Sequence, residues 1–262
     1  MPDISVIILS HNKPTVVKQA VQSVLEQTHQ NWEGVLVDSG VLFNQGVFKD
    51  LNDPRLKVRA SGEPPGFGKT TNMASWCFNR WLNSGQVRGE LILYLCDDDL
   101  FYPEAFATLW NFYTEHNREP QAMYASQDIG LLGRDGQTRV IGQRIAKRPA
   151  GKFCRGAKLD CKVDYLQFCH TAKILTKFRE IYQTDRYHNE DRRTGHHADG
   201  IFMEQIGKLT TVHPINKVLS MNRRTETSIN LEYATTPLGR AWAMLKAKGK
   251  GARERVFGPK YY

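Results

Sequence analysis

The sequence predicts an α/β fold in which a mostly parallel sheet carries helices on both faces. Through residues 4–115, short apolar runs alternate with segments whose apolar residues recur at helical spacing, a pattern typical of βα units. The first run, ISVIILS (residues 4–10), is continuously apolar and rich in β-branched residues, as expected of a strand buried on both faces. With 262 residues, the chain is long enough for one large domain.

The expected elements follow in regular order along the chain. Apolar runs predict strands over residues 4–10, 33–38, 56–60 and 90–96. Helical spacing predicts helices over about residues 14–25, 71–82 and 103–113, and later near residues 173–182 and 199–206. Pro14 suits the first turn of a helix, where its missing N–H is not needed. Residues 130–162 are rich in Gly, Lys and Arg, which indicates loops and small strands.

Positive charge is concentrated at the end of the chain. The formal net charge is +9, and from residue 240 onward Glu254 is the only acid among the basic residues Arg240, Lys246, Lys248, Lys250, Arg253, Arg255 and Lys260. Such a tail, which we delimit as residues 236–262, is attracted to polyanions such as nucleic acid or anionic lipid headgroups. A solvated, partly disordered end is the alternative interpretation.

The sequence favours a cytoplasmic protein, with peripheral contact to a membrane surface through this tail as an option. Its longest apolar runs are too short to span a bilayer, and no signal peptide is readable at the start. The five cysteines lack paired short spacings, which predicts reduced thiols. A zinc site built from Cys154, Cys161, Cys169 and nearby histidines fits no short Cys-x₂₋₄-Cys pattern.

Polar residues stand where three of the predicted strands end. Ser10, Asp38 and Asp97 occupy these ends, and ligands of parallel sheets bind beyond the carboxyl ends of the strands. Asp97 begins a run of three carboxylates with Asp98 and Asp99. Because like charges repel, such a run calls for a cation or ligand. A solvated acidic loop before the next helix is the plainer explanation.

A P-loop nucleotide hydrolase is one interpretation of these features. GEPPGFGKTT (residues 62–71) resembles a phosphate-binding loop with Gly68, Lys69 and Thr70, and LILYLCDD resembles the acidic strand that accompanies it. The motif needs glycine five positions before Gly68, but Glu63 stands there and would face phosphate oxygens. A glycine-rich surface loop explains the segment better than a P-loop does.

Several motifs in order favour another interpretation. SVIILSHNKPTVVKQAVQSVLEQTHQNWEGVLVDSG, then DPRLKV, then LYLCDDDLFYPEAF together resemble family 2 glycosyltransferases of the GT-A fold. The resemblance is strong over residues 4–115 and weak over residues 163–230. It implies a Rossmann-like mixed, mostly parallel sheet flanked by helices, in a single domain over residues 1–235. Residues 1–120 would form the nucleotide-sugar half and residues 121–235 the acceptor half.

The resemblance also implies a chemistry for the carboxylates. A nucleotide-sugar donor leaves as a diphosphate, and Mn²⁺ or Mg²⁺ can bridge that diphosphate to carboxylate oxygens. By position, Asp98 would bind the metal, Asp97 would face the ribose, and Asp99 would support or share the metal. The first acid of the family motif falls on Cys96 here.

Further donor contacts are carried over from the same resemblance. Asp38 would accept the N3–H of a uracil, which favours a UDP-sugar, although Ser39 replaces the second acid of that motif. The remaining candidates for nucleotide-sugar contacts are Ser10, His11 and Asn12 in the turn under the base, Lys69 and Asn72 in the following loop and helix, and Arg223 and Arg224 as a diphosphate clamp. A histidine that the family often has near these arginines is absent.

The acceptor half should supply a general base. An inverting transfer needs a group that deprotonates the attacking hydroxyl, and the resemblance assigns it to Asp199 at the start of a helix. Glu190 and Asp191 are rivals, and a simple helix cap is the alternative role for Asp199. Gln167 and His170 would contact sugar, although a histidine beside an apolar stretch is often a core residue.

The sequence therefore predicts a metal-dependent, inverting glycosyltransferase with a nucleotide-sugar donor. The basic tail suggests a polyanionic acceptor such as a modified DNA base, or a cell-surface glycan or lipid-linked precursor. A P-loop hydrolase and a GT-A-like binding module without transfer activity remain alternatives.

Overall fold

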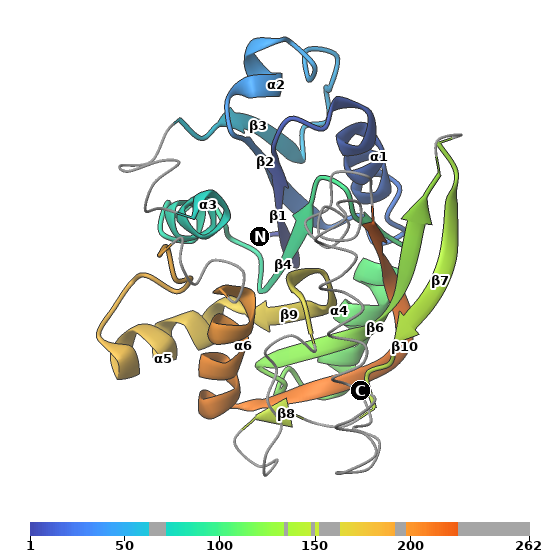
Figure 1. Ribbon diagram of the computed structural model, residues 1–262. Helices are drawn as coiled ribbons and strands as arrows, with labels where there is room; N and C mark the ends of the chain where they lie inside the picture. The colour runs from blue at the N-terminus through green and yellow to red at the C-terminus, as the bar shows by residue number, and fades with distance from the viewer. Residues whose placement is uncertain (63–71, 134–135, 148–149, 152–162, 192–197, 225–262) are drawn as a thin grey trace, which may run out of the picture.

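The computed structural model (Figure 1) describes residues 1–62, 72–133, 136–147, 150–151, 163–191 and 198–224. Its strands are β1 (Ile4–Ser10), β2 (Trp32–Asp38), β3 (Leu56–Ala60), β4 (Leu91–Cys96), β5 (Leu100–Phe101), β6 (Ala122–Leu132), β7 (Thr138–Arg144), β8 (Ala150–Gly151), β9 (Phe168–Thr171) and β10 (Thr211–Arg224). Its helices are α1 (Pro14–Leu25), α2 (Val41–Asn44), α3 (Met73–Leu82), α4 (Ala105–Glu115), α5 (Ala172–Tyr182) and α6 (Ala198–Leu209), with a 3₁₀ turn at Tyr165–Gln167. No helix in these ranges is long and apolar enough to cross a membrane.

One mixed sheet runs through the molecule in the order β3-β2-β1-β4-β9-β6-β10-β5, with β7 beside β6 and β8 beside β10. Strands β3, β2, β1 and β4 are parallel. Strand β9 runs antiparallel to both β4 and β6, so β6 and its parallel neighbour β10 point the same way as β4. The expected mostly parallel α/β sheet is confirmed.

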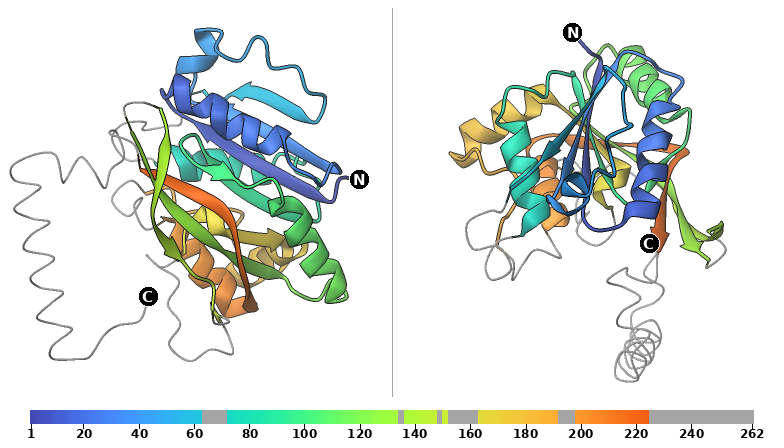
Figure 2. Two further views of the ribbon diagram at one scale, coloured as in Figure 1. Left: turned by 90° about the vertical axis from the view of Figure 1, so that its right-hand side faces the viewer. Right: turned by 90° about the horizontal axis from the view of Figure 1, so that it is seen from above.

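Helices cover both faces of this sheet (Figure 2). Side chains of β1 alternate between the two layers, because Ile4, Val6 and Ile8 pack with α1 and α4. Ile7 points to the other face, where the aromatic side chains of α3, α5 and α6 gather. The strand is thus buried on both sides, which explains its continuously apolar sequence.

The strand register aligns the polar residues that end β1, β2 and β4. Ser10 is the register partner of Asp38, and Leu9 is the partner of Cys96. Asp97 therefore emerges directly beside the end of β1. At the other end of the strand order, the long strand β10 pairs with β5, and Met221 is the register partner of Leu100. This pairing brings the end of β10 to the acidic segment that follows β4.

Most predicted elements lie close to their expected positions. The helix expected over 71–82 is observed from Met73, and the helix expected over 103–113 spans Ala105–Glu115. The sequence did not predict the two-residue strand β5, nor that β6 and β7 form a long hairpin within residues 122–144. In the described residues Cys77, Cys96 and Cys169 are free thiols. The basic tail lies outside the described residues.

Candidate functional site

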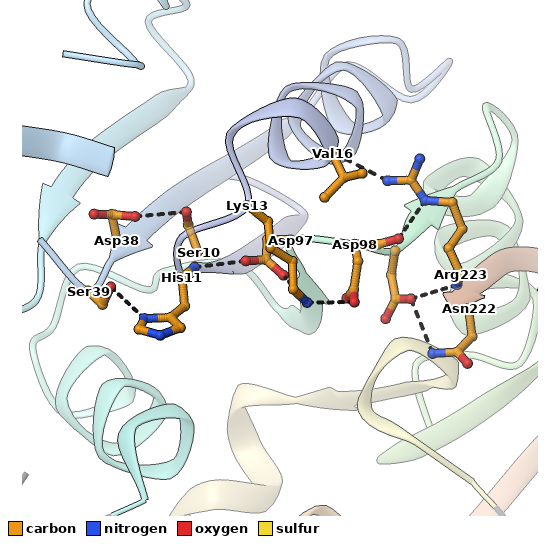
Figure 3. Close-up of polar contacts among 11 residues, drawn as sticks. Ser10, His11, Lys13, Val16, Asp38, Ser39, Asp97, Asp98, Asn222 and Arg223 are labelled. Atoms are coloured by element: carbon orange, nitrogen blue, oxygen red, sulfur yellow. Dashed lines mark hydrogen bonds and ion pairs between the residues drawn. The ribbon is translucent and has the colours of Figure 1, made fainter. Parts of the chain in front are cut away.

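The candidate site lies at the carboxyl ends of β1, β2 and β4 (Figure 3). Asp38 ends β2, and its side chain is completely buried. Its Oδ1 accepts a hydrogen bond from the Ser10 hydroxyl at 2.8 Å, while Oδ2 accepts from the backbone N–H groups of Gly40, Leu42 and Phe43 at 2.8, 3.0 and 3.0 Å. Asp38 therefore holds the turn before α2, and its predicted contact with a uracil stays a prediction.

The turn after β1 presents a more accessible surface. His11 and Asn12 are exposed, and Asn12 has a positive φ of 49°, a backbone conformation that asparagine tolerates better than most residues. The Nδ1 atom of His11 lies 2.8 Å from the Ser39 hydroxyl, which links the ends of β1 and β2. The exposed His11 and Asn12 and the half-buried Ser39 thus form a rim above the buried Ser10–Asp38 pair.

The carboxylates of Asp97 and Asp98 share one cation, the ammonium group of Lys13. Its Nζ lies 2.6 Å from Oδ2 of Asp98 and 3.2 Å from Oδ1 of Asp97. Asp97 also accepts the backbone N–H of His11 at 2.8 Å. Burial lowers the pKa of Lys13, but the charges of Asp97 and Asp98 outweigh it and raise this pKa overall. Burial raises the pKa of Asp97, although Lys13 and His11 counteract part of the shift.

Asp99 faces away from this cation. Its Oδ1 accepts hydrogen bonds from the Asn222 side chain at 3.1 Å and from the backbone N–H of Arg223 at 3.0 Å. The residue is 5% exposed, and burial together with the charges of Asp98 and Asp164 raises the pKa of Asp99 well above its usual range. In the described structure Asp99 supports the loop, which favours the supporting role over a metal shared with Asp98.

Arg223 also has a structural role instead of an open binding role. Its guanidinium donates to the backbone carbonyl of Asp98, to the Gln19 side chain and, at 3.3 Å, to the Val16 carbonyl of α1. Only 2% of the residue is exposed, so the arrangement favours a structural role for Arg223 over the predicted bidentate clamp on a diphosphate. Neighbouring Arg224 is half-buried, and its Nε is buried without a hydrogen-bond partner.

The fit of this site to a divalent cation is partial. Lys13 shows that Asp97 and Asp98 are arranged to hold positive charge between them, and carboxylate oxygens are the ligands that Mg²⁺ and Mn²⁺ prefer. Within the described residues, no group of three His, Cys, Asp or Glu side chains is placed to hold a metal. A divalent ion here would therefore take its remaining ligands from substrate phosphates and water.

The acceptor-side candidates separate into surface and core positions. Asp199 lies half-buried in the first turn of α6, and its Oδ1 accepts the N–H of Gly200 at 2.7 Å. Tyr165 lies within electrostatic range, because burial and then the charge of Asp199 raise the pKa of Tyr165 well above normal. The rival Glu190 instead anchors α3, since its carboxylate accepts from the Asn79 side chain at 2.8 Å. Asp191 is likewise half-buried.

Gln167 and His170 do not line a surface. His170 is completely buried, and its ring nitrogens lie 2.8 Å from the Tyr94 hydroxyl and 3.0 Å from the Thr171 carbonyl. Burial lowers the pKa of His170 to about 4. Gln167 is 3% exposed and donates to the Ala125 carbonyl at 2.8 Å. Both residues therefore belong to the core as the structure describes it, and their burial does not favour the predicted sugar contacts.

Two of the predicted nucleotide-sugar contacts, Lys69 and Asn72, come shortly before α3 in the sequence. Asn72 caps α3 by accepting the N–H of Ser75 at 2.9 Å, and its own backbone N–H donates to the Glu190 carbonyl at 2.7 Å. Lys69 lies outside the described residues. Because β2 and β1 separate β3 from the acidic strand β4, the arrangement does not favour a P-loop site.

Sequence reasoning missed Lys13 and Asn222 as parts of the site. Asn222 carried no local signal, because its contact with Asp99 joins residues 123 positions apart. Lys13, in contrast, did carry a local signal in the sequence. A lysine directly before α1 faces the positive end of the helix dipole, where acids are preferred. Such a lysine calls for acidic partners elsewhere in the fold.

Known proteins with similar sequences and structures agree with this architecture. Protein CgeD of Bacillus subtilis (strain 168) is 27% identical over 236 residues, which are 89% of this chain and 53% of CgeD. The chain thus spans about half the length of this curated relative.

Two solved structures share the fold. S. aureus TarS 1–349 in complex with UDP-GlcNAc superposes with a TM-score of 0.57 at 17% identity, covering 98% of this chain and 73% of that one. The mannosyltransferase PcManGT of Pyrobaculum calidifontis in complex with GDP-Man and Mn²⁺ gives a TM-score of 0.56 at 14% identity, covering 96% of this chain and 64% of that one. The family model for glycosyl transferase family 2 matches residues 5–137, and the chain therefore belongs to glycosyl transferase family 2, with its GT-A fold.

Proposed function

We propose that this protein transfers a sugar from a nucleotide-sugar donor, most simply a UDP-sugar, to an acceptor hydroxyl with the help of Mn²⁺ or Mg²⁺. The observation that carries the proposal is the pair of carboxylates, Asp97 and Asp98, which hold a cation at the carboxyl end of β4. The sheet places this pair where ligands of parallel sheets bind. The complexes of TarS with UDP-GlcNAc and of PcManGT with GDP-Man and Mn²⁺ support a nucleotide-sugar donor.

The donor would bind across the ends of β1, β2 and β4. His11, Asn12 and Ser39 offer the rim for the base, with Ser10 and Asp38 beneath them. Asp97 would face the ribose. Asp98, whose side chain is 15% exposed, is the better-placed ligand for the divalent ion. That ion would neutralise the charge that develops on the departing diphosphate.

Asp199 is our candidate for the general base. In an inverting transfer it would take the proton of the acceptor hydroxyl, while the acceptor oxygen bonds to the anomeric carbon opposite the breaking bond to the diphosphate. Its position, half-buried at the start of α6, is the observation that supports this role.

The acceptor is proposed from charge alone. The net charge of +9 and the basic residues 236–262 suit a polyanionic acceptor such as a modified DNA base, or an acceptor glycan or lipid precursor at an anionic surface. Phosphate contacts of this kind would weaken steeply with added salt.

A nucleotide-sugar-binding module without transfer activity is the second candidate. It is favoured by one observation, which is that Lys13 already neutralises part of the charge of Asp97 and Asp98. No observation favours the P-loop hydrolase in the same way.

Release of UDP from UDP-sugars, with and without Mn²⁺, tests the proposal. Asp98→Asn should abolish Mn²⁺-dependent release, because the amide keeps the shape but loses the charge. Asp199→Asn should abolish transfer to an acceptor while leaving UDP binding intact. Asp50→Asn, at an exposed position on the segment before β3, is the matched control. Tight UDP binding without turnover of any donor would favour the binding module, and equal activity of Asp98→Asn would refute the assignment.

A further inference from the structure

The side chain of Lys13 occupies the position that the proposed function gives to a metal ion. Its Nζ lies 2.6 Å from Asp98 and 3.2 Å from Asp97, and this side chain is 26% exposed. Solvent and ions therefore reach the contact. Figure 3 shows the lysine approaching the two carboxylates from the turn that leads into α1.

The backbone of Lys13 is fixed, but its side chain has room to move. Its carbonyl accepts the N–H of Val17 at 3.1 Å, and Pro14 sets the first turn of α1 directly after it. The neighbouring His11 N–H is bound to Asp97. Four rotatable bonds separate this anchored backbone from a compact, strongly hydrated ammonium group, so the charge can leave the carboxylates while the turn stays in place.

The surroundings of Lys13 offer a second use for that charge. Helix α1 has 12 residues, no acid in its first turn and no side-chain cap. No side chain caps this N-terminus, so it keeps the partial positive charge that attracts anions, although Pro14 has no N–H to donate. An ammonium group released from Asp97 and Asp98 would add to this positive potential at the same edge of the sheet.

We propose that Lys13 is an exchangeable counter-cation, which neutralises Asp97 and Asp98 until a divalent ion displaces it and then binds the diphosphate of the nucleotide. This inference rests on the proposed function and adds a residue to its donor site. Two carboxylates and one ammonium leave one negative charge, whereas a divalent ion neutralises both carboxylates and frees the ammonium group. The exchange makes metal and nucleotide each favour the binding of the other.

The coupling has measurable consequences for Lys13→Met. The variant loses the competitor for the carboxylates, so Mn²⁺ alone should bind more tightly than to the wild-type protein. It also loses a cation for the diphosphate, so UDP should bind more weakly in saturating Mn²⁺. Because coupling is reciprocal, the improvement that Mn²⁺ brings to UDP affinity should shrink by the same factor as the improvement that UDP brings to Mn²⁺ affinity.

Titration of the full chain with Mn²⁺, followed by electron paramagnetic resonance of the free ion, measures the metal step without any turnover. We expect Lys13→Met to bind Mn²⁺ about tenfold more tightly and UDP about tenfold more weakly, within the range typical of coupled sites. Lys13→Arg, which keeps the charge, should bind Mn²⁺ like the wild-type protein. Lys18→Met removes an exposed lysine from the adjoining helix α1 and controls for the change in net charge.

The metal titration also separates this inference from the proposed function. Wild-type protein that binds no UDP would overturn the proposed function, whereas tighter Mn²⁺ binding by Lys13→Met would still support the competition. Mn²⁺ binding by Lys13→Met that is no tighter than wild type, or an equal gain in Lys18→Met, would overturn the exchange. Thermal melts verify that each variant is folded, and Lys13→Gln replaces Lys13→Met in the same comparison if the latter is not.

Discussion

Replacing Arg223 with methionine removes the side chain that connects the end of β10 to the acidic segment and to α1. Its guanidinium makes three hydrogen bonds, to the Asp98 carbonyl, the Gln19 side chain and the Val16 carbonyl. The residue is 2% exposed, so water cannot replace these bonds in the variant without rearrangement. Methionine keeps much of the apolar volume of the side chain but none of the donors.

The expected loss follows from these contacts. A hydrogen bond from a charged donor contributes roughly 1.5–3 kcal/mol, but the bond to Val16 is long at 3.3 Å. Removing one partner from a buried charged network costs about 3–5 kcal/mol in measured cases, and we expect Arg223→Met to lie in that range. For a chain of this size, that loss corresponds to a fall in Tm of roughly 6–20 °C.

Thermal and urea unfolding of the two proteins measure this loss directly. Arg118→Met is the matched control, because the Arg118 side chain is 54% exposed and pairs with Glu90 at 3.0 Å on the surface. Such exposed pairs contribute about 1 kcal/mol or less. UDP affinity in the presence of Mn²⁺ is measured in parallel on both variants.

The structural role and the clamp role of Arg223 predict opposite results. If Arg223 mainly binds diphosphate, Arg223→Met will melt like Arg118→Met while its UDP affinity falls. That combination would refute the reasoning from burial and hydrogen bonds. A large fall in Tm, with residual UDP affinity in the folded fraction at low temperature, would support it.

Three further substitutions test the roles of Asp38, Asp99 and His170. Asp38→Asn should destabilise the protein by about 1–2 kcal/mol in urea unfolding, as for other lost helix caps, because an amide cannot accept all of the backbone and hydroxyl donors around Asp38. Asp99→Asn should keep most of its Mn²⁺ affinity while Asp98→Asn loses it, and equal losses would contradict the divided roles. Finally, His170 is neutral in the fold, where its pKa is about 4, but protonates near pH 6.5 when unfolded. The unfolded state therefore binds more protons, so His170 alone should contribute a loss of roughly 2 kcal/mol in stability between pH 7 and pH 5. Buried His188, whose pKa is also lowered by burial, adds to the same acid slope, and this slope should be smaller in His170→Asn.

The sequence was sufficient for the part of the fold that local pattern controls. The run at residues 4–10 is apolar at every position but its serines, and β1 is indeed buried between two helical layers. The hairpin of β6 and β7 could not be predicted, because residues 138–144 are mostly exposed and lack a clear period of apolar residues. Pairing with β6 stabilises β7, and no local sequence pattern marks it as a strand.

The site was predictable only in outline. Ser10, Asp38 and Asp97 do lie together at the ends of β1, β2 and β4, because parallel strands bring their ends to one edge of a sheet. The direction of each side chain was not predictable. Asp98 and Asp99 are adjacent in the sequence, yet Asp98 contacts Lys13 and Asp99 contacts the end of β10. The choice between them depends on β10, which reaches this edge only in the folded sheet.

The three aspartates are held by elements from distant parts of the sequence. Arg223 and Asn222 at the end of β10 hold Asp99 and the Asp98 carbonyl, while Lys13 before α1 holds the Asp97 and Asp98 carboxylates. The acidic segment is therefore fixed on the side of β10 by buried bonds and on the side of α1 by a part-buried ion pair. Under the proposed exchange, a divalent ion would displace the second contact and leave the first intact. The geometry of Asp98 would then be set by β10, and its charge would be balanced by whichever cation, Lys13 or the metal ion, lies beside it.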